Sequence, residues 1–144
     1  MAISHTPIGR VRSSFDSPAD VTHDAVDEAT GRIVLEDEYE DGLDGLGEFS
    51  HVVVLAHLDG VEGYHLTSRP PHVDGVEVGV FATRSPHRPN PIAQTVVELV
   101  DRDGATLSVR GLDLVDGTPV LDVKPYVPTV DDESDLSLGW LDQR

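Results

Sequence analysis

IAQTVVELVDRDGATLSVRGLDLVDGTPVLDV, residues Ile92–Val123, is the stretch that decides the fold. Asp103-Gly104 and Asp116-Gly117 are typical tight-turn pairs, and each lies between runs rich in β-branched and apolar residues. Those runs are predicted strands: Ile92–Val100, Thr106–Leu112 and Pro119–Val123. A hairpin followed by a further turn and strand indicates an antiparallel, β-rich fold.

Further strands are predicted on the N-terminal side of this stretch: His5–Ser13, Arg32–Leu35, Phe49–Leu58 and Val76–Thr83. Asp16–Gly31 starts with Ser17-Pro18, a typical helix cap and first helical position, and is either a short helix or an irregular loop. Glu36–Gly47 is acidic and is broken into turns by its glycines. Short strands at this spacing predict a mainly β fold, a small single barrel or a sandwich, with short helices or loops at its edge.

The glycines Gly42, Gly45 and Gly47 do not have the G-x-G-x-x-G spacing of a dinucleotide-binding loop. A strand rather than a helix is predicted after them, so no helix N-terminus would face a phosphate. We therefore interpret them as turn residues and predict a fold outside the Rossmann class.

Composition limits the function classes. The chain has 144 residues, 38% of them hydrophobic, and no cysteine, which excludes a disulfide, a thiolate nucleophile or a cysteine zinc site. No apolar run approaches the roughly 20 residues that cross a bilayer. Met1–Ile8 has no apolar signal-peptide core, so we expect no signal peptide, no membrane partner and a cytoplasmic location.

The net charge is −17, from 27 acidic and 10 basic residues, and Lys124 is the only lysine. One interpretation is a halophilic protein, since at molar salt the Debye length falls to about 3 Å and self-repulsion is screened. The alternative is a mildly acidic mesophilic protein. The near-absence of lysine favours the halophile. At low salt such a charge would repel nucleic acid.

The seven histidines raise the question of a metal site. His51 and His57 are six residues apart in a predicted strand, so they share a face but lie roughly 20 Å apart, too far to share one ion. His65, His72 and His87 lie in or near predicted loops, where spacing neither requires nor excludes a site. We predict structural or solvent-facing histidines and no metal.

The loop Arg84-Ser85-Pro86-His87-Arg88-Pro89-Asn90-Pro91 carries many directional polar groups. Its three prolines fix the backbone and hold two guanidinium groups, an imidazole, a hydroxyl and an amide in place. Arg84 and Arg88, with nearby Arg69, form the only basic cluster that the sequence reveals. A rigid connector is the alternative, but we favour a binding loop.

A second polar segment is Leu112–Pro128, LDLVDGTPVLDVKPYVP. If its later part is a strand, Asp122, Lys124 and Tyr126 share one face, where the lone lysine would neutralise an acid. The alternative is a turn followed by an ordinary edge strand.

Together, Val78–Ile92 and Leu112–Pro128 resemble the two signatures of the TsaA-like, or TrmO, family, and Ile8–Ser13 and Gly45–Leu55 agree more weakly. The resemblance implies a small β-barrel that forms a homodimer and binds S-adenosylmethionine outside the Rossmann class. The reaction it implies is methylation of N6 of threonylcarbamoyladenosine next to the anticodon of tRNA.

The resemblance also implies roles for single residues. Cofactor-binding positions fall at His23, Arg84, Gln94, Thr95, Leu112, Asp113, Leu114 and Val115. By residue type, Arg88, Lys124 and Tyr126 are assigned to the substrate. Asn90 and Asp116 are assigned to catalysis, where an amide or a carboxylate would assist loss of the N6 proton.

This chain departs from the family pattern at three places. Thr22-His23-Asp24 stands near the usual Pro-Arg-Gln loop, Asp59-Gly60 replaces a usual histidine, and Ala93 replaces a usual glycine. Residues 1–130 are predicted to form the barrel domain and residues 131–144 an acidic tail. Two alternatives remain open: an S-adenosylmethionine-binding protein without RNA methyltransferase activity, and a methyltransferase acting on a small metabolite.

Overall fold

The computed structural model describes residues 1–22, 29–70, 73–128 and 136–143. The chain divides into two compact units, one formed by Met1–Asp59 with Ile92–Tyr126 and the other by Gly60–Pro91 with Val127–Arg144. Two predictions, the ligand His23 and the domain boundary after residue 130, lie outside the described residues. Across the described ranges, no helix has both the length and the apolar character needed to cross a membrane.

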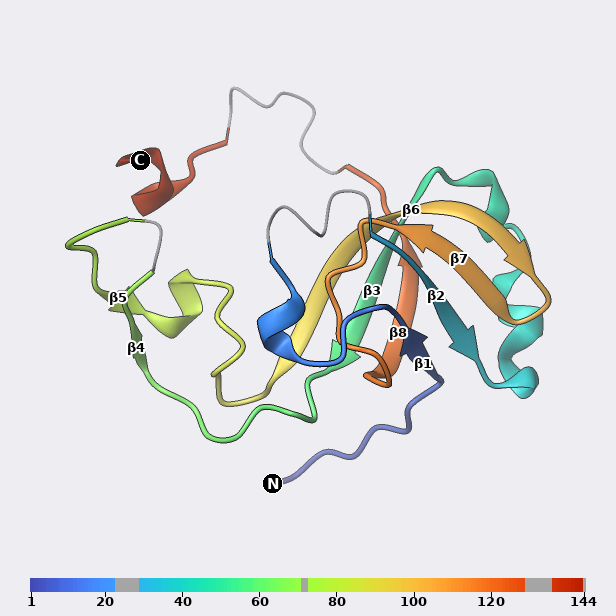
Figure 1. The fold of residues 1–144 in the computed structure, drawn as a ribbon, viewed down its shortest axis with the longest axis horizontal. Helices are drawn as coiled ribbons and strands as arrows, with labels where there is room; N and C mark the ends of the chain where they lie inside the picture. The colour runs from blue at the N-terminus through green and yellow to red at the C-terminus, as the bar shows by residue number, and fades with distance from the viewer. Residues whose placement is uncertain (23–28, 71–72, 129–135, 144) are drawn as a thin grey trace. The chain divides into compact units, whose positions relative to one another are not determined.

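The first unit is a closed antiparallel barrel with the strand order β1-β2-β7-β6-β3-β8 (Figure 1). Its strands are β1 (Gly9–Arg12), β2 (Thr30–Leu35), β3 (His51–His57), β6 (Ile92–Asp103), β7 (Thr106–Arg110) and β8 (Pro119–Pro125). Closure leaves no unpaired edge among these six strands. The predicted mainly β barrel is therefore confirmed, and the sandwich alternative is not.

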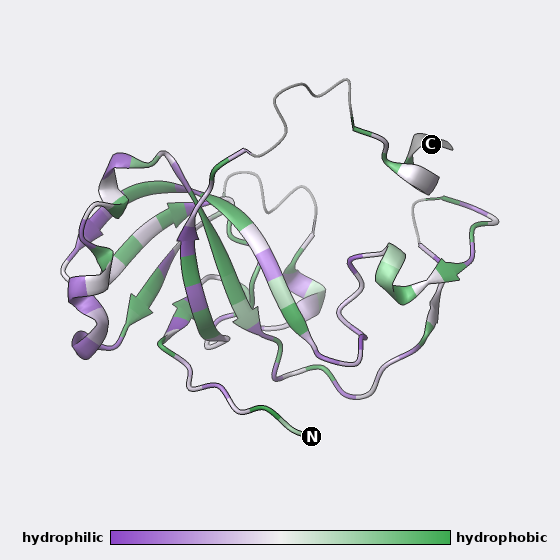
Figure 2. Cartoon of the chain, turned by 180° about the vertical axis from the view of Figure 1, so that it is seen from behind, coloured by the Kyte–Doolittle hydropathy of each residue, from purple (hydrophilic) through white to green (hydrophobic). Residues whose placement is uncertain are grey.

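The barrel interior is filled by alternating apolar side chains. In β3, Val52, Val54 and Ala56 are fully buried, whereas the residues between them face outward. Figure 2 shows hydrophobic residues concentrated along the barrel strands. The remaining core residues lie on the other five barrel strands and on the segments next to them: Val11, Ile33, Leu35, Leu43, Val97, Ala105, Leu107, Val109, Leu112, Leu114 and Val120.

Two glycines allow the close approach of neighbouring segments. A Cβ at Gly9 would overlap with the carbonyl oxygen of Val34 on the paired strand β2. A Cβ at Gly31 would lie 2.6 Å from Cδ2 of Leu112 and 2.9 Å from the carbonyl oxygen of Arg12. Glycine at both positions is therefore a packing requirement rather than a turn requirement.

The β6–β7 hairpin runs further than the sequence predicts. β6 continues to Asp103, because its register against β7 shifts between Leu99 and Asp101 and so restores pairing beyond the break in alternation. The two-residue loop is Gly104-Ala105, one residue later than the predicted turn pair Asp103-Gly104, and Gly104, with φ of 60°, takes its first position.

Short 3-10 helices connect the barrel strands. η1 (Pro18–Asp20) begins after the capping residue Ser17, as predicted for the start of Asp16–Gly31. η2 (Asp37–Leu43) and η3 (Leu46–Glu48) occupy the acidic, glycine-broken segment after β2. These connections account for the predicted short helices at the edge of the barrel.

The second unit contains β4 (Thr67–Ser68), β5 (Val78–Gly79), η4 (Val80–Ala82) and η6 (Gly139–Gln143). The predicted strand Val76–Thr83 is wrong in extent: only two of its residues pair with β4, and the next three form η4. The indole N–H of Trp140 donates a 2.7 Å hydrogen bond to the carbonyl oxygen of Ala82. The hydrogen bond thereby attaches η6 to η4, which precedes the loop that carries the first polar motif.

Candidate functional site

The proline-rich loop of the second unit is held by its own side chains. The hydroxyl of Thr83 donates to the carbonyl oxygen of Val80 (2.8 Å) and accepts from the amide of Ser85 (3.2 Å). The hydroxyl of Ser85 accepts from the amide of His87 at 3.2 Å. Nη1 of Arg88 donates to the carbonyl oxygens of Thr83 (2.9 Å) and Ser85 (3.0 Å). Arg88, for which substrate binding is a prediction, therefore positions the loop in the structure.

The predicted basic cluster of this unit contains one unpaired arginine. Arg69 forms an exposed ion pair with Glu77 at 3.5 Å, and Arg88 is bonded to the loop backbone. Arg84 and Asn90 are exposed, and within the described ranges neither side chain has a hydrogen bond or an ion pair. Arg84 and Asn90 are thus available to a ligand, as is the exposed imidazole of His87, whose ring contacts the ring of His65.

In the barrel unit, the turn after β7 is locked against the end of β1. Leu112 and Leu114 are 0% and 5% exposed, so their side chains stabilise the core. The hydroxyl of Ser13 donates to the carbonyl oxygen of Leu114 at 2.7 Å. The carboxylate of Asp116 accepts a 3.0 Å bond from the Ser13 amide and lies 4.0 Å from Nη1 of Arg12. Any ligand contact by Leu112 or Leu114 would have to use the backbone.

The other predicted cofactor positions in this unit lie on or near the barrel surface. Asp113 is exposed and Val115 is half-buried. Gln94 is exposed on β6, opposite Leu55, whereas its neighbour Thr95 is only 9% exposed. Among these four, Asp113 and Gln94 present polar groups to solvent.

The predicted pairing on β8 is confirmed. Nζ of Lys124 lies 3.3 Å from a carboxylate oxygen of Asp122, and the neighbouring Tyr126 is exposed.

His51 and His57 are exposed at the two ends of β3, as predicted. Within the ranges that the structure describes, no group of three or more histidine or acidic side chains is arranged to hold a metal ion.

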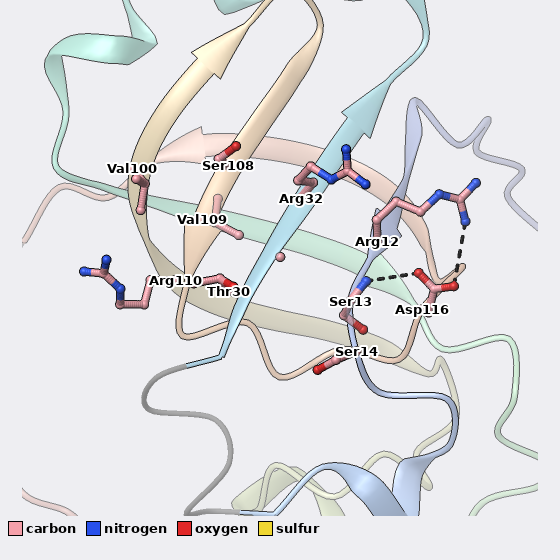
Figure 3. Close-up of a pocket in the computed structure, with 11 residues that line it drawn as sticks. Arg12, Ser13, Ser14, Thr30, Arg32, Val100, Ser108, Val109, Arg110 and Asp116 are labelled. Atoms are coloured by element: carbon pink, nitrogen blue, oxygen red, sulfur yellow. Dashed lines mark hydrogen bonds and ion pairs between the residues drawn. The ribbon is translucent and has the colours of Figure 1, made fainter.

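A second basic cluster, absent from the sequence analysis, lies on the barrel (Figure 3). It lines a groove of about 580 Å³, here named the arginine groove. The charged and hydroxyl-bearing residues of its lining are Arg12, Arg32, Arg110, Asp116, Ser13, Ser14, Thr30 and Ser108. The prediction that Arg69, Arg84 and Arg88 form the only basic cluster is therefore wrong.

The register of three adjacent strands explains why the sequence conceals this groove. Arg12 on β1 stands directly opposite Arg32 on β2, and Arg32 stands opposite Ser108 on β7. Arg110 follows two residues later on the same face of β7, opposite Thr30. The three arginines are far apart in sequence, and only the order β1-β2-β7 makes them neighbours.

A family model described as the tRNA-methyltransferase O N-terminal domain matches residues 10–132. The chain belongs to this family. The match includes both polar motifs and every arginine of the arginine groove. The resemblance noted in the sequence is thereby confirmed.

Relatives of this chain include a protein named for cofactor binding and a protein named for a tRNA methylation reaction. A "Probable S-adenosyl-L-methionine-binding protein" of Pyrococcus abyssi is 39% identical over 145 residues, covering 99% of this chain and 78% of that protein. A mouse protein named "tRNA (adenine(37)-N6)-methyltransferase" is 46% identical over 101 residues, covering 69% of this chain and 23% of the mouse protein.

The fold agrees with a solved member of the family. The crystal structure of TrmO from Pseudomonas aeruginosa superimposes with a TM-score of 0.78 and 36% sequence identity, covering 99% of this chain. This chain spans 62% of the length of that protein. The confirmed family and fold leave the substrate and the residue roles to be proposed.

Proposed function

We propose that this chain is an S-adenosylmethionine-dependent methyltransferase that modifies N6 of threonylcarbamoyladenosine beside the anticodon of tRNA. The match of the TrmO N-terminal domain family over residues 10–132 carries the proposal. The mouse relative supports an adenine N6 target at position 37, and the Pyrococcus relative supports the cofactor. A tRNA substrate agrees with a cytoplasmic location.

The polar groups available in the described residues suit this cofactor. The exposed guanidinium of Arg84 would bind its carboxylate, and the exposed carboxylate of Asp113 would bind its amino group or ribose hydroxyls. Gln94 would supply a further amide contact. Thr95, Leu112, Leu114 and Val115 would shape the site through backbone atoms and packing.

When bound, S-adenosylmethionine supplies a methyl group on a sulfonium leaving group. That chemistry would be transfer of the methyl group to adenine N6, with the sulfur leaving as a neutral thioether and N6 losing one proton. The protein must therefore hold N6 in line with the methyl group and accept a proton or stabilise its departure. Asn90 has its amide free for this role, whereas Asp116 already accepts a bond from the Ser13 amide.

The substrate contacts are assigned to Arg88, Lys124 and Tyr126. The threonyl carboxylate of the modified base is an anion that suits a guanidinium or ammonium group. Nη1 of Arg88 is bonded to the loop backbone, and Lys124 is paired with Asp122. Each cation would therefore bind the substrate carboxylate while keeping its present partner. Tyr126 is exposed and offers an aromatic face for a base.

A homodimer is part of the proposal. The outer face of the barrel carries the exposed Val96 and Ile92 on β6, and Val96 stands opposite Val53 on β3. An apolar stripe on this face would be covered by a second copy. Sedimentation should show a dimer, and Val96→Glu should give a folded monomer.

The decisive experiment combines cofactor binding with mass spectrometry. Calorimetric titration in high potassium chloride should show saturable S-adenosylmethionine binding near one site per chain. Arg84→Ala should weaken it at least tenfold, while Arg69→Ala, which removes an equal charge from an exposed ion pair, should not. Methylated threonylcarbamoyladenosine should then form in tRNA that carries the unmethylated base.

A second candidate is a binding protein for S-adenosylmethionine without RNA methyltransferase activity. The net charge of −17 favours it, because RNA is repelled at low salt. Cofactor binding without methyl transfer to tRNA, in a folded sample over a range of salt concentrations, would select this candidate over the first.

A further inference from the structure

We propose that the arginine groove is a docking site for the phosphate backbone of RNA, beside the turn that carries Asp116. The inference rests on the proposed function, because the tRNA substrate supplies the phosphates. It concerns three residues to which the sequence analysis assigned no role: Arg12, Arg32 and Arg110.

The groove reverses the charge of the chain. Its lining holds three arginines and one aspartate, a net charge of +2, in a chain whose net charge is −17. Arg110 is paired with Glu98 at 3.0 Å and Arg12 lies 4.0 Å from Asp116, but Arg32 has no ion-pair partner among the residues that the structure describes. Positive charge is thus concentrated and only partly neutralised on this face.

The register of the arginines points to an anion between them. Arg12 and Arg32 are direct cross-strand partners, and like charges in that position destabilise a sheet. An exposed phosphate would accept hydrogen bonds from both guanidinium groups at once, which converts this repulsion into a bidentate site. Figure 3 shows Arg12 and Arg32 side by side on adjacent strands, with Arg110 on β7 beyond them.

Hydroxyl groups complete the set of donors. Ser14, Thr30 and Ser108 line the groove, and no hydrogen bond engages their hydroxyls within the described residues. Arginine with serine and threonine is the usual combination for contacts to phosphate and sugar, which position a nucleic acid without reading its sequence. The groove therefore suits backbone docking rather than base recognition.

The cofactor itself does not suit this groove. S-adenosylmethionine carries one carboxylate against one ammonium and one sulfonium, so its net charge is positive and a groove of net charge +2 disfavours it. RNA presents one negative charge per phosphate. The sign of the charge thus favours RNA over the cofactor as the occupant of this groove.

The test measures affinity for a fluorescent tRNA transcript, without cofactor, as a function of potassium chloride concentration. Each phosphate contact contributes a slope of about −0.7 to −0.9 in log affinity against log salt. Arg32→Ala should reduce the slope by about this amount, which is roughly a five- to eightfold loss at 0.1 M salt. Arg69→Ala removes an equal charge outside the groove and should leave the affinity within about twofold. Circular dichroism confirms the folded barrel.

A charge change of opposite sign gives an independent check. Glu98→Gln removes the anion that pairs with Arg110 and should strengthen tRNA binding. Unchanged affinity in Arg32→Ala, or an equal loss in Arg69→Ala, would overturn the proposal. Pyrophosphate affinity is measured on the same variants. If Arg32→Ala weakens the binding of pyrophosphate but not of tRNA, the groove is a site for free phosphates, and this outcome would also overturn the proposal.

The docking proposal and the proposed function fail in different assays. If Arg32→Ala weakens tRNA binding but the protein without the substitution transfers no methyl group to tRNA, the docking proposal stands and the proposed reaction is wrong. If methyl transfer occurs with an unchanged KM for tRNA in Arg32→Ala, the reaction stands and the groove is not its docking site.

Discussion

Replacing Arg88 with alanine should loosen the proline-rich loop while leaving the barrel intact. Nη1 of Arg88 is bonded to the carbonyl oxygens of Thr83 and Ser85, at 2.9 and 3.0 Å. Alanine removes the donor and leaves both oxygens to solvent. The side chain is half-buried and the donor is charged, so the bonds together contribute about 1.5–3 kcal/mol to the closed loop. The local opening equilibrium should rise about 10- to 150-fold.

Amide hydrogen exchange measured by NMR reports this opening directly. The amides of Ser85 and His87 are bonded to the hydroxyls of Thr83 and Ser85, so they exchange when the loop opens. The barrel amide of Leu99, bonded to the Ser50 carbonyl at 2.8 Å, is an internal reference that should not change.

Arg84→Ala is the matched control, because it removes an equal charge from the same loop without removing a hydrogen bond. Faster exchange at Ser85 and His87 in Arg88→Ala alone would support a loop held by Arg88. Unchanged exchange in Arg88→Ala, or an equal increase in Arg84→Ala, would refute this reasoning. S-adenosylmethionine affinity measured on both variants would separate a lost contact at Arg84 from a loosened loop.

Three further changes test the packing around the site. Gly9→Ala should lower the free energy of unfolding by about 2–3 kcal/mol, whereas Gly42→Ala, with no atom within 4 Å of its Cβ, should change it by less than about 0.5 kcal/mol. Equal losses in denaturant titrations of the two variants would contradict the close β1–β2 approach. Asp116→Ala should cost about 1–2 kcal/mol by the same measurement and the exposed Asp113→Ala much less, because of the two only Asp116 accepts a hydrogen bond from the main-chain amide of Ser13. Trp140→Phe should make limited proteolysis of the C-terminal segment about fivefold faster, since it removes one hydrogen bond of about 1 kcal/mol; an unchanged rate would show that this bond does not hold the segment.

The barrel was predictable because its strands are marked by apolar runs and its hairpin by a turn glycine, which are local features of the sequence. Phe49–Leu58 contains the apolar run that becomes β3, and Gly104 of the predicted Asp103-Gly104 pair begins the turn of the β6–β7 hairpin. The bounds of Val76–Thr83 were not predictable, because the hydroxyl of Thr83 accepts and donates bonds that end the strand at Gly79 and favour η4. A side chain in the following loop, rather than strand propensity, decides that boundary.

The candidate site was predictable only where its residues are adjacent in sequence. The loop 84–91 is recognisable in the sequence by its prolines, and the Asp122–Lys124 pair follows from strand periodicity. The locking of Asp116 onto Ser13 and the meeting of Arg12 with Arg32 depend on strand order, which periodicity does not contain. A search for arginines on the outward positions of every predicted strand would have found the members of the groove but not their register.

The same charge distribution that opposes RNA binding at low salt is compatible with it at high salt. At about 1 M salt the Debye length is about 3 Å, so repulsion from carboxylates elsewhere on the surface is largely screened. Contacts inside the arginine groove act at hydrogen-bond distance, so salt screening weakens them less than it weakens this long-range repulsion. Arginine suits this condition better than lysine, because its planar guanidinium binds phosphate through two directed bonds and is less strongly hydrated. In a chain where Lys124 is the only lysine, arginines brought together by β1, β2 and β7 provide attraction that depends on geometry more than on net charge.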